Sequence, residues 1–62
     1  MTARPMTPYR AVAIAEGFEE AEDQDEVLAA WQYLHTSRLA YSLQGWFGRT
    51  AQQLVEEGLI DG

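Results

Sequence analysis

Trp46, Phe47 and Arg49 are the side chains best suited to binding chemistry, because they stand around two glycines just before a stretch with helical spacing. An arginine beside a helix start can bind a carboxylate or a phosphate bidentately, helped by the free N–H groups of that helix. Trp46 and Phe47 could be exposed anchors of a partner interface, where aromatic residues and arginine are enriched. Alternatively, both rings could close the core while Arg49 bonds the carbonyls of the Gly45 turn or a nearby carboxylate. The core interpretation suits Phe47 better than Trp46.

An acidic run forms the second candidate site, with seven carboxylates in the eleven residues from 16 to 26. Carboxylates at phosphate-like spacing could occupy the basic groove of a nucleic-acid-binding protein, with fast and salt-dependent association. The alternative is a solvated, helix-capping linker that keeps the protein soluble. The candidate contacts of the mimicry hypothesis are Glu19, Glu20, Glu22 and Asp25.

No catalytic set stands out in the chain. His35 is the one histidine and the chain has no cysteine, so we interpret His35 as a helix cap or a surface residue. The acidic run lacks the alternating ligands and central glycine of a calcium loop. We therefore expect no metal, no cofactor and no enzymatic activity. A residual enzyme hypothesis requires a pocket around Arg49 and His35.

The chain is short and acidic, with 62 residues, ten aspartates and glutamates, four arginines and a net charge of −6. This balance argues against direct binding to nucleic acid. No apolar run is long enough to span a membrane and no signal peptide is recognisable, so we expect a cytoplasmic protein without membrane contact. A domain of this size hides only about 60% of its unfolded surface. A homodimer is predicted because four large aromatics exceed what one small core hides, namely Trp31, Tyr33, Tyr41 and Trp46.

Hydrophobic spacing predicts an all-α fold, a compact bundle of three to four short helices in one domain over residues 1–62. Residues 1–6 carry no periodicity and are expected to fray. Thr7 and Pro8 are suited to cap and begin a helix, which is predicted over residues 8–16.

Gly17 should end this helix in the left-handed conformation, with Phe18 folding back over the last turn. Residues 17–24 then form an acidic linker. Asp23 and Glu26 resemble a capping box, in which Asp23 caps the next helix and Glu26 reaches back to it. Part of the acidic run therefore has a structural role.

The second helix is predicted over residues 25–35, with Trp31 as its central anchor. Another helical stretch over residues 37–44 either continues it or stands alone, and Gly45 should terminate that stretch. Residues 45–48 are predicted to form a turn.

The last helix should follow that turn and end at Gly58. Counting back from Gly58 places Leu54 three positions inside the helix end, where Leu59 should pack on it. The predicted core consists of apolar residues at helical spacing: Val12, Ile14, Phe18, Leu28, Trp31, Leu34, Leu39, Leu43, Phe47, Ala51, Leu54 and Leu59.

Four segments carry a family resemblance: Ala30-Trp31-Gln32-Tyr33-Leu34, Leu39-Ala40-Tyr41-Ser42-Leu43-Gln44-Gly45, Gly48-Arg49-Thr50-Ala51 and Leu54-Val55-Glu56-Glu57-Gly58. From about residue 26 to 60, the chain resembles a family of short, uncharacterised proteins encoded by tailed bacteriophages. The resemblance implies a phage or prophage origin and a compact helical domain, but no reaction. The family is expected to have a glycine before the Leu-Ala pair. Arg38 stands there in this chain, so the turn after the second helix could differ.

These observations predict a small, non-catalytic, phage-encoded accessory protein that binds a host or phage protein and could inhibit it. Trp46, Phe47 and Arg49 would make the contact together with the acidic run. One alternative is an acidic nucleic-acid mimic that blocks a DNA- or RNA-binding host protein. The other is a minor virion or assembly subunit, which would self-associate stably.

Overall fold

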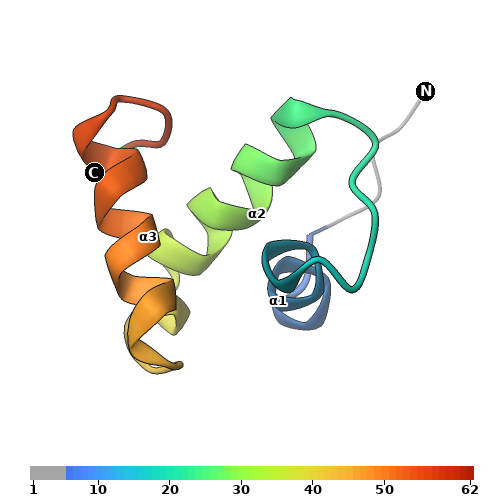
Figure 1. The fold of residues 1–62 in the computed structure, drawn as a ribbon, viewed down its shortest axis with the longest axis horizontal. Coiled ribbons are helices and arrows are strands. Elements are labelled where there is room, and N and C mark those ends of the chain that lie inside the picture. The colour runs from blue at the N-terminus through green and yellow to red at the C-terminus, as the bar shows by residue number, and fades with distance from the viewer. Residues whose placement is uncertain (1–5) are drawn as a thin grey trace.

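The computed structural model describes residues 6–62, which form three α-helices and one short 3₁₀ helix and contain no strand. The central helix α2 (Gln24–Thr36) contacts both α1 (Pro8–Glu16) and α3 (Gly45–Glu56) (Figure 1). The 3₁₀ helix η1 (Leu39–Tyr41) connects α2 to α3 and contacts both. The molecule measures 32 × 22 × 18 Å. The all-α bundle predicted from the sequence is confirmed.

Helix α1 begins and ends where its capping residues predict. Thr7 Oγ1 accepts the backbone N–H of Arg10 at 3.1 Å, and Gly17 adopts a left-handed φ of 85°. The N–H of Gly17 then donates to the carbonyl of Ile14 at 3.1 Å, which closes the end of the helix. Residues 1–5 of the segment expected to fray lie outside the described residues. Met6 packs against the core.

The prediction that Phe18 joins the core is wrong, because its side chain is 83% exposed. The backbone N–H of Phe18 donates to the carbonyl of Ala13 at 2.9 Å and completes the cap of α1. Ala11 and Ile14 form the buried stripe of α1, and Phe18 would extend that stripe only if the helix continued. Gly17 ends the helix first and takes Phe18 off the stripe.

Helix α2 lies within one residue of the predicted range at each end. Asp23 Oδ1 accepts the N–H of Glu26 at 2.9 Å, as the predicted capping box requires. The reciprocal bond differs by one position, because Glu26 Oε1 accepts the N–H of Glu22 at 2.8 Å. Ala30, Trp31 and Leu34 form the buried face.

The prediction for residues 37–48 is wrong in two respects. Only η1 is helical between α2 and α3, and the expected turn around Gly45 is instead the first turn of α3. Arg38 adopts a left-handed φ of 70°, which ends the α-helical path after α2. Leu43, expected in the core, is therefore 38% exposed. Phe47 and Ala51 are four residues apart and buried on one face of α3.

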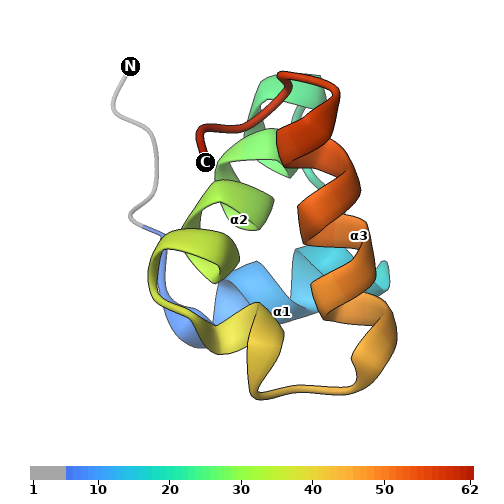
Figure 2. The same cartoon turned by 90° about the vertical axis from the view of Figure 1, so that its left-hand side faces the viewer.

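The C-terminal segment ends α3 as predicted but buries a different side chain. Gly58 has a φ of 76°, and the N–H of Leu59 donates to the carbonyl of Leu54 at 3.0 Å. Leu59 is nevertheless 46% exposed, so its predicted core position is wrong, and Ile60 is buried in its place at 6%. The tail turns back to α2 (Figure 2), where the side-chain amide of Gln32 bonds both backbone groups of Asp61. This attachment directs Ile60 inward.

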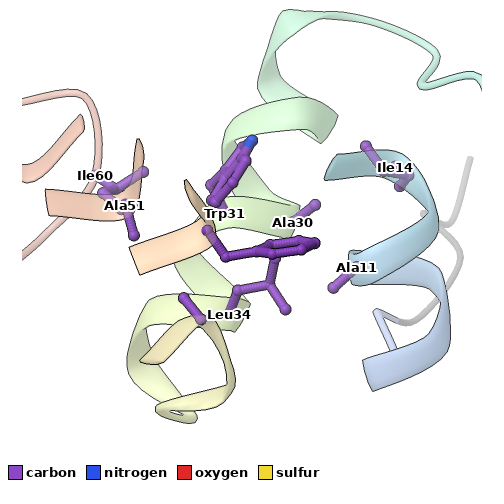
Figure 3. Close-up of a cluster of buried hydrophobic side chains, with 9 residues drawn as sticks. Ala11, Ile14, Ala30, Trp31, Leu34, Ala51 and Ile60 are labelled. Carbon is purple, nitrogen blue, oxygen red and sulfur yellow. The ribbon is translucent and has the colours of Figure 1, made fainter. Parts of the chain in front are cut away.

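The core gathers around α2, with Ala11 and Ile14 on the α1 side and Ala51 and Ile60 on the other (Figure 3). Alanines at close contacts let the helices approach one another. Of the predicted residues, the buried ones are Ile14, Trp31, Leu34, Phe47 and Ala51, and the partly buried ones packed on them are Val12, Leu28, Leu39 and Leu54. The core residues that the prediction omitted are Ala11, Ala30, Ala40 and Ile60.

Candidate functional site

The aromatic pair at the start of α3 divides between core and surface. Phe47 is 2% exposed and belongs to the core. Trp46 is partly buried and stacks on Phe47 with ring centroids 4.0 Å apart, while its ring also meets Trp31 edge-on at 6.1 Å. Phe47 therefore offers no surface for a partner. The exposed part of the Trp46 ring is available for a partner contact.

Arg49 is exposed and lies one turn inside α3. Its guanidinium folds back over Gly45, since a Cβ atom built on Gly45 would lie 3.1 Å from Arg49 Nη1. No carboxylate within residues 6–62 lies within ion-pair distance of it.

An open groove of about 770 Å³ runs along the same face of α3. Along the helix, its lining residues are Tyr41 from η1, then Gly48, Arg49, Gln52, Gln53, Glu56 and Glu57. The groove thus has a cationic end and an anionic end, with two amide side chains between them. This pattern of donors and acceptors is suited to a polypeptide ligand.

Tyr41 is held in place at the cationic end of the groove. Its Oη accepts a hydrogen bond from Gln52 Nε2 at 2.7 Å and lies 2.7 Å from His35 Nδ1. The guanidinium of Arg38 lies 5.0 Å from the ring centroid, which is a cation–π contact. His35 thus supports Tyr41 and does not line the groove beside Arg49.

Arg38 occupies the position where the family resemblance predicts glycine, and its φ of 70° explains that expectation. The left-handed conformation costs about 1–3 kcal/mol in a non-glycine residue. The cation–π contact with Tyr41 stabilises the folded chain by about 0.5–1 kcal/mol at an exposed site. Glycine also loses about 0.5–1 kcal/mol more chain entropy on folding, so Arg38→Gly should raise the free energy of unfolding by up to about 2 kcal/mol in urea denaturation. Arg38→Ala keeps the strain and loses the contact, so it should lower that free energy; a rise of equal size in both variants would contradict this account.

Arg10 pairs with two of the seven carboxylates of the acidic run, a role that was not predicted from the sequence. Arg10 Nε donates to Glu19 Oε2 at 3.0 Å, and Arg10 Nη2 donates to Glu26 Oε2 at 3.0 Å. The hydrogen bonds that Arg10 donates to Glu26, and then those to Glu19, raise the pKa of Arg10 above its usual value. The three side chains are only 13–27% exposed. Their ion pairs connect the segment after α1 to the first turns of α1 and α2. Glu19, predicted as a partner contact, has a structural role here.

The other predicted acidic contacts remain on the surface. Glu20, Glu22 and Asp25 are exposed, and none of them forms an ion pair within the described part of the chain. Phe18 lies in the same segment with 83% of its side chain exposed. The segment therefore presents an aromatic ring among unneutralised carboxylates.

The two predicted contact regions do not form one site. Figure 1 shows the segment after α1 and helix α3 at opposite ends of the long axis, with α2 between them. A partner that contacts Arg49 and Glu20 together must therefore reach across the molecule.

Two further properties of residues 6–62 concern metals and membranes. No three His, Asp or Glu side chains in this range are placed to hold a metal ion together. None of its helices combines the length and apolar character needed to cross a membrane.

The fold and the two surfaces define a small all-α domain with an acidic aromatic segment at one end and a groove at the other. The chain belongs to the family described as a domain of unknown function (DUF7417), whose model matches residues 11–62. The comparisons found no match among curated proteins and none among solved structures.

Proposed function

We propose that the chain is a small, non-catalytic, phage-encoded accessory protein that binds a positively charged surface on a host or phage protein. Its origin is proposed from the resemblance to phage proteins carried by residues 26–60. The observation that carries the binding function is Phe18, which is 83% exposed within a segment of exposed carboxylates. An aromatic anchor ringed by charges is typical of protein-binding surfaces.

Electrostatics decide which partner suits this segment. The chain carries a net charge of −6, and Arg10 neutralises Glu19 and Glu26 of the acidic run. A basic partner is therefore drawn to the exposed carboxylates over a distance, and Phe18 supplies short-range contact once the surfaces meet. Such binding is fast and weakens as salt is added. A DNA- or RNA-binding protein has a surface of the required charge, so inhibition by occupation of that surface is one outcome.

Affinity capture from host lysate tests the proposal when matched variants are compared. Glu20→Gln with Asp25→Asn removes two charges from the acidic segment without disturbing Arg10. Glu56→Gln with Glu57→Gln removes the same charge from the far end of the molecule. We expect a basic protein to be captured by the wild type and by the second pair, and lost with the first pair.

Two more variants place the contact. Phe18→Ser should also lose the captured protein, because the side chain contributes to the partner surface and not to the core. The pair Trp46→Ala and Arg49→Ala tests the α3 surface predicted from the sequence. If capture is lost only with the α3 pair, the partner binds the α3 surface and not the acidic segment. Equal capture by every variant would refute both the acidic segment and the α3 surface as the contact.

A further inference from the structure

The groove on α3 has a fixed aromatic wall that is open to a ligand. Gly48 lines the groove beside Tyr41, and a Cβ atom on Gly48 would lie 3.3 Å from Tyr41 Cδ1. The absence of a side chain lets the ring pack closely on α3, and Gln52 and His35 hold the Tyr41 hydroxyl, while 36% of the Tyr41 side chain stays exposed. A second ring can therefore pack against Tyr41 without first ordering it.

The cationic residues of the described chain are distributed unevenly around this wall. Arg10 is occupied by two glutamates at the other end of the molecule. Arg38 lies over the Tyr41 ring and Arg49 lines the groove beside it, and neither has a carboxylate within ion-pair distance among residues 6–62. In a chain with ten acidic residues, this end of the groove is a local basic site.

The segment after α1 has the complementary chemistry. Phe18 is exposed, and Glu16 and Glu20 lie exposed two positions before and after it. A phenyl ring fits beside tyrosine and guanidinium groups, which attract aromatic faces. Carboxylates beside that ring reach guanidinium groups for bidentate bonds. The groove's own acids, Glu56 and Glu57, begin about 10 Å along α3 from Arg49 and leave this end free.

We propose that the groove binds a second copy of this chain, with Phe18 of one molecule seated between Tyr41 and Arg49 of the next. Because the two surfaces lie at opposite ends of the long axis (Figure 1), the contact is head-to-tail. The resulting assembly keeps one free groove and one free Phe18 segment, so association continues into short chains or closes into a ring. The contact is smaller than a standard interface and is weak and concentration-dependent.

The contact covers the same surface that we propose binds a basic partner, so it regulates that binding. This consequence rests on the proposed function. Phe18 and its neighbouring carboxylates face either another copy or a basic partner. Self-association therefore competes with partner binding, and dilution or an abundant partner releases single molecules. The association itself involves purified protein alone, so its failure is distinguishable from a failure to bind a partner.

Sedimentation equilibrium of the full chain from about 0.01 to 1 mM tests the contact. The wild type should exceed the monomer mass of 7.0 kDa as concentration rises. Phe18→Ala and Arg49→Ala should each weaken association at least about tenfold, because each removes one side of the anchor. Tyr9→Ala, at an equally exposed aromatic, and Glu56→Gln, at the far end of the groove, should associate like the wild type. Circular dichroism checks that every variant is folded.

A mixture of the two defective variants gives the sharpest result. Phe18→Ala keeps an intact groove and Arg49→Ala keeps an intact Phe18 segment, so mixing them should restore one contact. The expected product is a 1:1 dimer that does not grow further. A wild type that stays at the monomer mass, a Phe18→Ala variant that associates normally, or a mixture that stays monomeric would each overturn the proposal.

Discussion

Leu34→Ala should remove most of the folding free energy, because Leu34 is a fully buried side chain at the centre of the core. Truncation of such a leucine costs about 2–5 kcal/mol. A domain of 62 residues has about 3–9 kcal/mol of stability in total. Urea denaturation followed by tryptophan fluorescence measures the loss, since Trp31 lies in the same core.

Leu43→Ala is the matched control for this measurement. The sequence places both leucines in the core, but the structure leaves Leu43 38% exposed. Its truncation should cost less than about 1 kcal/mol. Equal losses in the two variants would mean that the segment between α2 and α3 packs inward, as the sequence spacing suggested.

The sequence was most informative where bonds form between close neighbours. Thr7 and Asp23 each cap a helix through the N–H three residues on, and Gly17 and Gly58 each end one in the left-handed conformation. These signals depend on a few consecutive residues, so they locate α1 and the end of α3 without knowledge of the rest of the fold.

The sequence was misleading where distant segments decide the outcome. Two glycines around Trp46 suggested a turn, whereas Gly48 is glycine because Tyr41 packs against it. Leu59 and Ile60 are both apolar, and the attachment of the tail to Gln32 next to Ile60 favours the burial of Ile60. Neither choice is visible in local spacing.

The same limit applies to the acidic run. Seven carboxylates look alike in the sequence, yet Glu19 and Glu26 are held by an arginine nine and sixteen residues away. Glu20 and Asp25 remain exposed. A lone arginine in the helix before an acidic run was the available signal, but the register of the pairing is a property of the folded chain.

Phe47→Ala should have the second large effect, with a loss of about 3–5 kcal/mol. The ring is 2% exposed and lies 6.0 Å from Trp31 between the ring centroids. A loss of that size approaches the whole stability of the domain, so the variant should be largely unfolded at room temperature by circular dichroism. Phe47→Ala is therefore unsuitable for testing a partner contact.

Trp46→Ala separates the two interpretations of this aromatic pair. Trp46 rests on Phe47 from outside, so its removal takes away stacking worth about 0.5–1.5 kcal/mol and part of its apolar burial. The fold should survive with a lowered urea midpoint, and any loss of binding by this variant then reports on a contact. If Trp46→Ala unfolds the chain while Phe47→Ala remains folded, the roles of the two rings are reversed and Phe47 returns to the surface as the candidate anchor.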